Sequence, residues 1–251
     1  MIETLPEPAD QEQAQYASPA SDLPTLSSTI ADTSPIPDTA LFLGLADDNL
    51  PVLLDLYDPV PGPLLIVADE ASGKTLFLQM IARSIELLHN PSDVQSGVVT
   101  QYPDEWNHFQ DSQSVVGIYP AQGGSAGELL QSLVTWAHNN KENSQSILLL
   151  IDDLEAITKL DPQTGQNLRW LLLRGPSRRV WPIVTINASR VHNMEAWLGF
   201  FRTRLFGHTR DAHNSHFIAN DPDKLFDDLA ASQFTMREGN NWLNFWAPAI
   251  D

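Results

Sequence analysis

The sequence predicts an α/β fold with a mainly parallel sheet, helices on both of its faces and a β-hairpin at the C-terminal end. Short apolar runs bounded by turn residues are typical of buried parallel strands, and here they alternate with segments whose apolar residues recur at helical spacing. Such alternation favours a parallel sheet covered by helices on both faces. The end of the chain differs, because two strand-like segments there are joined by a glycine-containing turn.

The expected elements follow one another in regular order. Residues 64–67 (Leu-Leu-Ile-Val) predict a buried strand, and residues 74–88 predict the helix after it. Residues 147–151 form the most apolar strand, which ends at Asp152 and Asp153. Further strands are predicted at residues 51–57, 98–100, 115–119 and 181–186, and further helices at residues 127–139 and 166–173. The hairpin is predicted from residues 233–237 and 242–246, with a turn at residues 238–241.

Length and composition limit the classes of protein to consider. The 251 residues, of which 42% are hydrophobic, are enough for one large domain or for one domain with a tail. The absence of cysteine excludes disulfides, a thiolate nucleophile and cysteine-ligated metal centres. No apolar run approaches the roughly 20 residues that span a bilayer, and the acidic start is unlike a signal peptide. We therefore expect a cytoplasmic protein with no membrane partner.

The net charge of −18 is unevenly distributed along the chain. Residues 1–40 carry seven acidic residues, no basic ones and no periodic apolar pattern, which predicts a disordered acidic tail before a domain at residues 41–251. Residues 169–210 form a basic segment, with eight arginines and one acidic residue. This basic segment indicates a contact with a polyanion or a seam between oppositely charged neighbours, unless it consists of ordinary surface arginines.

A partial phosphate-loop motif lies between the strand at residues 64–67 and the helix that follows it. The motif is a glycine, any four residues, and then Gly-Lys-Ser/Thr. This chain keeps Gly73, Lys74 and Thr75 but has Ala68 at the first glycine position. Backbone N–H groups of such a loop hold phosphates, its lysine reaches the β- and γ-phosphates, and its threonine holds Mg²⁺. The predicted nucleotide-binding residues are Ala68, Asp69, Glu70, Ala71, Ser72, Gly73, Lys74 and Thr75.

The paired acids after residues 147–151 fit the metal side of the same site. We expect Asp152 to hold Mg²⁺ together with Thr75, and Asp153 to polarise the attacking water. Asp153 is one methylene shorter than the glutamate usual in such enzymes, and Glu155 is a candidate substitute. Two plainer interpretations stay open: the Gly-Lys-Thr segment begins a helix with an exposed lysine, and the paired acids end a strand and cap the next helix.

Several segments in the same order and at similar spacing resemble the FtsK/HerA family of hexameric P-loop motors. They include a lead-in with Leu43-Gly44, the phosphate-loop segment and a strand ending at Asn187, which stands where the family usually has a glutamine that reads the γ-phosphate. The resemblance covers about residues 41–248 and is carried by residues 43–56, 64–74, 147–153, 181–187, 202–206 and 233–245.

The resemblance implies a RecA-like P-loop NTPase fold, with ATP and Mg²⁺ as cofactors. It also implies assembly, either as a homo-oligomeric ring such as a hexamer or with related ATPase subunits. In such rings an arginine from a neighbouring subunit reaches the γ-phosphate, and Arg202 and Arg204 are the candidates here. The predicted catalytic residues are thus Asp153, Asn187, Arg202 and Arg204. Duplex DNA, less often a protein, is threaded by these rings, and residues 169–210 are the segment expected to contact it.

Departures from the family pattern leave more than one function open. Alanine stands at positions 68 and 71 where glycine is expected, Asp153 replaces glutamate and Asn187 replaces glutamine. The leading hypothesis is an ATP-binding module with slow hydrolysis, and the alternative is a catalytically inactive scaffold that keeps the fold. A small-molecule kinase is a weaker third hypothesis, because no lid or acceptor pocket is evident. His208, His213 and His216 are spaced poorly for a zinc site.

Overall fold

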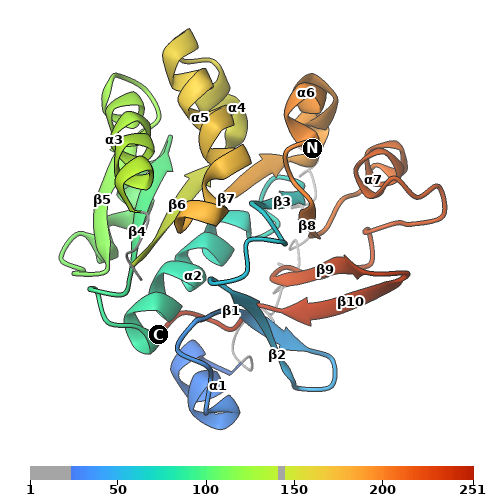
Figure 1. Cartoon of the computed structure of the whole chain (residues 1–251). Coiled ribbons are helices and arrows are strands. Elements are labelled where there is room, and N and C mark those ends of the chain that lie inside the picture. The colour runs from blue at the N-terminus through green and yellow to red at the C-terminus, as the bar shows by residue number, and fades with distance from the viewer. Residues whose placement is uncertain (1–23, 141–144) are drawn as a thin grey trace, which may run out of the picture.

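A computed structural model of the chain describes residues 24–140 and 145–251. A ten-stranded sheet in the order β2-β1-β10-β9-β8-β3-β7-β6-β4-β5 runs through the molecule (Figure 1). Its strands are β1 (Ala40–Ala46), β2 (Pro51–Asp55), β3 (Leu64–Ala68), β4 (Val94–Thr100), β5 (Val115–Pro120), β6 (Ser146–Asp152), β7 (Val180–Asn187), β8 (Thr203–Phe206), β9 (Gln233–Glu238) and β10 (Asn241–Trp246). From β8 to β5 neighbouring strands pair in parallel, whereas β9, β10, β1 and β2 extend the sheet with antiparallel pairs. The predicted mainly parallel α/β sheet is confirmed.

Helices cover both faces of this sheet (Figure 1). The α-helices are α1 (Leu26–Thr33), α2 (Lys74–Leu88), α3 (Ser125–Asn139), α4 (Leu154–Thr158), α5 (Pro162–Arg174), α6 (Glu195–Leu198) and α7 (Ala212–Ala219). Short 3₁₀ helices are η2 (Pro103–Phe109), η3 (Pro176–Arg178) and η4 (Ala188–Met194). Residues of α1 and α2 belong to one hydrophobic cluster, and residues of α3 to α7 belong to the other.

Strand β3 is apolar at every position because both of its faces are buried. Leu64 and Ile66 belong to the cluster on the α2 side, and Leu65 and Val67 belong to the cluster on the opposite side. Successive side chains of a strand point to opposite faces, so a strand buried on both faces must be apolar at every position. Such burial on both sides fixes the carboxyl end of β3 at the start of the predicted phosphate loop.

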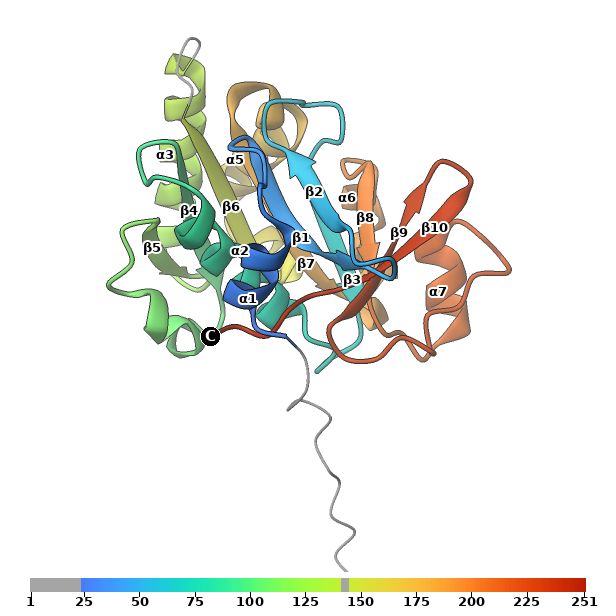
Figure 2. The same cartoon turned by 90° about the horizontal axis from the view of Figure 1, so that it is seen from below.

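The C-terminal hairpin is present as predicted. Strands β9 and β10 pair in antiparallel register from Glu238 opposite Asn241 to Gln233 opposite Trp246, and Gly239 in the turn has φ +61°. Strand β9 also pairs with β8, while β10 pairs with β1 (Figure 2). The hairpin therefore joins the parallel strands to the pair β1–β2.

The N-terminal boundary differs from the prediction. Within the predicted tail, residues 26–33 form α1, and Leu26 and Ile30 are buried. Leu26 N donates to Ala249 O at 2.8 Å, which joins α1 to the end of the chain. The prediction of disorder is thus wrong for residues 24–40, because two apolar side chains one helical turn apart are enough to dock this short helix. The remainder of the predicted tail, residues 1–23, lies outside the described residues.

In the described part of the chain, no helix is both long and apolar enough to cross a membrane.

Candidate nucleotide-binding site

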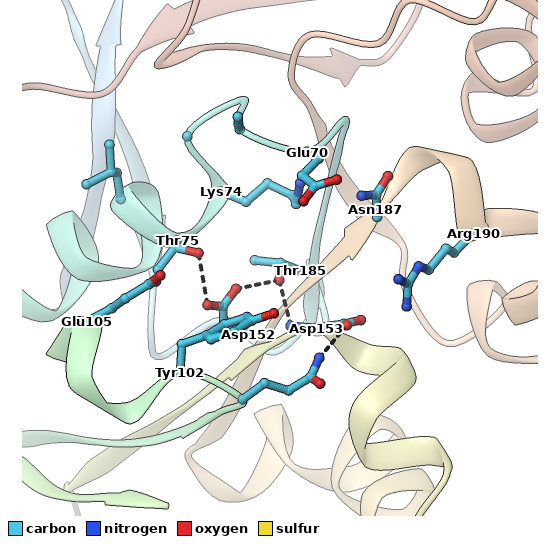
Figure 3. Close-up of a pocket in the computed structure, with 14 residues that line it drawn as sticks. Glu70, Lys74, Thr75, Tyr102, Glu105, Asp152, Asp153, Thr185, Asn187 and Arg190 are labelled. Carbon is cyan, nitrogen blue, oxygen red and sulfur yellow. Dashed lines mark hydrogen bonds between the residues drawn. The ribbon is translucent and has the colours of Figure 1, made fainter. Parts of the chain in front are cut away.

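A pocket of about 420 Å³ lies where the carboxyl ends of β3, β4, β6 and β7 meet (Figure 3). The carboxyl edge of a parallel sheet is where ligands bind in this class of fold. The pocket is lined by Glu70, Ala71, Gly73, Lys74, Thr75, Leu76, Gln101, Tyr102, Glu105, Asp152, Asp153, Thr185, Asn187 and Arg190. Five of the eight predicted loop residues thus lie in the same pocket as the acids after β6, and Ala68, Asp69 and Ser72 do not line it.

The loop between β3 and α2 presents unpaired backbone donors. The N–H groups of residues 70–75 donate no hydrogen bond to another described residue. Gly73 has φ +87° and no capping side chain precedes α2, so the first N–H groups of this helix stay available. Unpaired N–H groups at the start of a helix attract anions, and a phosphate fits this arrangement.

Three hydrogen bonds hold the loop against the segment after β8. Asp69 N donates to His208 O at 2.8 Å, and the carboxylate of Asp69 accepts from Arg210 N at 2.9 Å. Ser72 Oγ also donates to His208 O at 3.3 Å. Asp69 and Ser72 therefore shape the loop from outside the pocket, and Ala68 is fully buried in β3.

The two alanines of the loop differ in backbone conformation. Both stand where the resemblance predicts glycine, but Ala68 is a strand residue without positive φ. Ala71 has φ +59°, in the left-handed region that glycine adopts at little cost and alanine does not. Of the two replacements, only Ala71 therefore places an alanine in a conformation that favours glycine.

Lys74 folds back over the loop that precedes it. Its Nζ donates to Ala68 O at 3.1 Å and to Asp69 O at 2.5 Å. Burial lowers the pKa of Lys74, an effect that the carboxylates of Asp152 and Asp69 oppose. Two neutral carbonyls are weak partners for a desolvated ammonium group, so a phosphate oxygen would be a better partner.

Thr75 and Asp152 form an oxygen-rich corner of the pocket. Thr75 Oγ1 donates to Asp152 Oδ2 at 2.9 Å, and Thr185 Oγ1 donates to Asp152 Oδ1 at 3.0 Å. Burial raises the pKa of Asp152, while the hydroxyl hydrogen bonds and Lys74 oppose this rise. Hard cations such as Mg²⁺ prefer carboxylate and hydroxyl oxygens, so the donor set of Thr75 and Asp152 fits the predicted metal.

Asp153 is engaged with the protein through both carboxylate oxygens. Asp153 Oδ1 accepts from Glu155 N at 3.0 Å, which caps α4, and Oδ2 accepts from Gln101 Nε2 at 2.9 Å. Its backbone has φ +81°, and its N–H donates to Thr185 Oγ1 at 2.8 Å. Asp153 lines the pocket and also caps a helix, so the structural interpretation applies to it, and its predicted catalytic role stays a prediction.

Asn187 and Arg190 lie on the side of the pocket opposite Thr75 (Figure 3). Asn187 Oδ1 accepts from Ser189 N at 3.1 Å and from Ser189 Oγ at 3.0 Å, which caps η4. Arg190, in η4, pairs with the carboxylate of Glu155. Asn187 lines the pocket, whereas Glu155 does not and is bound instead to Arg190 and to Lys159.

Arg202 and Arg204 are not part of this pocket. Strand β8 runs parallel to β3 with Thr203 opposite Leu64, so both arginines lie at the amino ends of the strands, away from the phosphate loop. The guanidinium of Arg204 donates to three backbone carbonyls, those of Phe201, Ile218 and Leu198. Arg204 therefore stabilises its surroundings, and Arg202 is the exposed member of the pair.

Other arginines of residues 169–210 also have local partners. Arg169 lies over the ring of Trp197 at 4.6 Å, and Arg179 lies over the ring of Tyr57 at 3.4 Å. Arg169 and Arg204 thus contact the adjacent α6 residues Trp197 and Leu198, whereas Arg179 and Arg190 have partners outside α6.

Six residues that line the pocket were not predicted from the sequence, namely Leu76 of α2 and five residues with polar groups. Gln101, Tyr102 and Glu105 follow β4, Thr185 lies within β7, and Arg190 follows β7. The only signal for them is that polar residues at the carboxyl ends of neighbouring parallel strands converge on one edge.

Comparisons with known proteins agree with this geometry. No protein-family model and no curated protein matches the chain. Among solved structures, the chain is similar to Thermomonospora curvata EccC (ATPases 2 and 3, in complex with a signal sequence peptide), with a TM-score of 0.69 and 14% identity. That match covers 91% of this chain and 43% of the EccC chain, so this chain spans less than half of it.

Two further solved structures extend the comparison. The conjugation coupling protein TcpA of pCW3, solved in monomer form with ATPγS, matches with a TM-score of 0.67 and 14% identity, covering 91% of this chain and 70% of that chain. The genome packaging NTPase B204 of Sulfolobus turreted icosahedral virus 2, in complex with ATPγS, matches with a TM-score of 0.53 and 14% identity, covering 74% of this chain and 97% of that chain.

The chain has the fold of FtsK/HerA-like P-loop ATPases. The family resemblance predicted from the sequence is confirmed at the level of the fold, and so is the predicted C-terminal hairpin. Identities of 14% show a shared fold and no more. Within this fold, the pocket beside β3 and α2 is the candidate nucleotide-binding site of the chain.

Proposed function

We propose that this chain binds ATP with Mg²⁺ and hydrolyses it slowly. One observation carries the proposal: the unpaired N–H groups of residues 70–75 and the ammonium group of Lys74 lie in the same pocket as the Thr75–Asp152 pair. The N–H groups and the ammonium group are suited to binding phosphates. The oxygen atoms of Thr75 and Asp152 are suited to binding a hard cation. The structures of TcpA and B204 with ATPγS support a nucleotide in this fold.

The roles of the residues follow from their positions. Lys74 would exchange its two carbonyl partners for phosphate oxygens, and Thr75 and Asp152 would hold Mg²⁺. The metal, when bound, would neutralise part of the phosphate charge. Asp153 would orient the attacking water, with Asn187 on the opposite side of the γ-phosphate. Hydrolysis would be slow because Gln101 and Glu155 N already engage both oxygens of Asp153.

Assembly belongs to the same proposal. Arg202 is exposed at the edge opposite the pocket, so it could reach a nucleotide only in another subunit. A homo-oligomeric ring, or an assembly with related ATPase subunits, would bring it there. Duplex DNA is a candidate substrate through exposed arginines of residues 169–210. A cytoplasmic location is in keeping with EccC, whose cytoplasmic domain matches with a TM-score of 0.70.

A second candidate function is a catalytically inactive P-loop scaffold. The observation that favours it is the capping of α4 by Asp153, which gives this carboxylate a structural role without any nucleotide. A scaffold would keep the pocket and bind nucleotide without turning it over.

Equilibrium dialysis with ATPγS, with and without Mg²⁺, tests nucleotide binding, and phosphate release from ATP separates the two candidates. We expect the parent to bind ATPγS and Lys74→Ala to lose binding with an unchanged circular dichroism spectrum. Equal binding by the parent and Lys74→Ala would contradict the phosphate-loop assignment. The mass of the protein in solution with ATP and Mg²⁺ tests assembly, and a strict monomer under all conditions favours the scaffold.

A further inference from the structure

We propose that Arg190 contacts the γ-phosphate of a nucleotide bound to its own chain, and that Glu155 holds it aside until then. This inference rests on the proposed nucleotide binding and names a residue of that site which the sequence motifs do not include. Arg190 is the only arginine among the described residues that line the pocket.

The charge of the pocket calls for such a residue. Its described lining contains four acidic side chains, those of Glu70, Glu105, Asp152 and Asp153, and two basic ones, those of Lys74 and Arg190. A nucleoside triphosphate brings several further negative charges into this acidic surrounding. Mg²⁺ held by Thr75 and Asp152 would offset the negative charge of Asp152. A second cationic side chain is still needed near the terminal phosphate.

The placement of Arg190 is set by the strand beside the phosphate loop. Ala68 pairs with Asn187 at the ends of β3 and β7, and Asn187 caps η4, which carries Arg190. Arg190 therefore lies only three residues after the end of β7, which is paired with the end of β3 just before the loop. Its side chain lies beside Asn187 and above Asp153 in Figure 3.

The ion pair between Arg190 and Glu155 can be exchanged at low cost. The side chain of Arg190 is 48% exposed, and partly exposed ion pairs contribute little to stability. Glu155 Oε1 is also paired with Lys159 Nζ at 2.8 Å, so Glu155 keeps a cationic partner when Arg190 moves. Guanidinium–phosphate hydrogen bonds are stronger and often bidentate, so the exchange favours the phosphate.

The comparison of two nucleotides tests this contact, because only the triphosphate carries a γ-phosphate. Equilibrium dialysis with Mg²⁺ is done with ATPγS and with ADP on the full chain. For Arg190→Ala we expect ATPγS affinity to fall about tenfold or more, the loss typical of one charge-assisted hydrogen-bonding group, with ADP affinity nearly unchanged. Arg190→Lys should recover part of the loss, since it restores the charge without the planar fork.

Two further variants sharpen the result. Glu155→Gln releases Arg190 from its anionic partner and should raise the preference for ATPγS over ADP. Arg237→Ala removes an exposed arginine of β9, outside the pocket and outside residues 169–210, and serves as the matched control with parent-like values for both nucleotides.

Each outcome decides the inference. Parent-like ATPγS affinity in Arg190→Ala overturns it, and an equal loss of ATPγS and ADP overturns it as well, because that pattern indicates general damage to the pocket. If the parent binds neither nucleotide, or binds both as Lys74→Ala does, the proposed function fails and this inference fails with it. Thermal melts of all variants serve to check that losses of nucleotide affinity do not come from unfolding.

Discussion

Gln101 Nε2 donates a hydrogen bond of 2.9 Å to Asp153 Oδ2, joining residues that follow the neighbouring strands β4 and β6. The other carboxylate oxygen of Asp153 accepts from Glu155 N. The side chain proposed to orient water is therefore held on both sides by its own chain. Burial raises the pKa of Asp153, and the bond from Glu155 N opposes this rise.

This relationship predicts how turnover responds to substitution. Asp153→Glu alone should leave phosphate release low, because Gln101 remains beside the longer carboxylate. Gln101→Ala combined with Asp153→Glu should raise phosphate release about tenfold or more, since a well-placed general base contributes about 10²–10⁴-fold. The measurement is steady-state phosphate release at saturating ATP and Mg²⁺, with and without duplex DNA. The double variant Gln101→Ala/Asp153→Ala is the control, and it should not show this gain in phosphate release. If Gln101→Ala/Asp153→Glu releases no phosphate, the scaffold is favoured.

The two loop alanines should respond in opposite directions to glycine. Ala71→Gly relieves a left-handed alanine and should raise the free energy of unfolding by about 0.5–1 kcal/mol. Ala68→Gly should lower it by about 1 kcal/mol, because Ala68 is fully buried in β3 and packs against Gly207. Urea unfolding curves of the two variants check this, and stabilisation by Ala68→Gly would show that the strain lies there after all.

Particular residues show what the sequence can and cannot predict here. Lys74, Thr75 and Asp152 meet as expected, because the apolar runs before them identify buried parallel strands whose carboxyl ends share one edge. Gln101 and Arg190 carry no local signal, since their roles depend on which strands become neighbours. The place of Arg204 depends on strand direction: an arginine at the start of a parallel strand cannot face a loop at the end of the next. Helix α1 was missed because two apolar residues make a weak pattern in an acidic segment.

Truncations should separate the two parts of the predicted tail. Removing residues 1–38 deletes α1 with the buried Leu26 and Ile30, and it should lower the free energy of unfolding by more than about 2 kcal/mol, since a fully buried leucine contributes about 1.5–3 kcal/mol. Removing residues 1–23 should leave it nearly unchanged, because that segment is acidic and offers few apolar groups to bury. Denaturant unfolding checks both, and equal stability of the two truncations would show that α1 contributes nothing.

Asp152 should make stability depend on pH and on Mg²⁺. Burial raises the pKa of Asp152 in the folded protein, so above this pKa the folded state carries the full penalty of a desolvated carboxylate. As pH falls through the raised pKa, the folded protein takes up a proton that the unfolded chain does not, and the penalty disappears.

Without Mg²⁺, Asp152→Asn should therefore be more stable than the parent at pH 7–8, and this advantage should shrink as the solution becomes acidic. Mg²⁺ should stabilise the parent by binding the folded state and leave Asp152→Asn unaffected. Urea unfolding at several pH values, with Asp104→Asn as an exposed control, checks this, and an advantage of Asp152→Asn that grows toward acidic pH would contradict it.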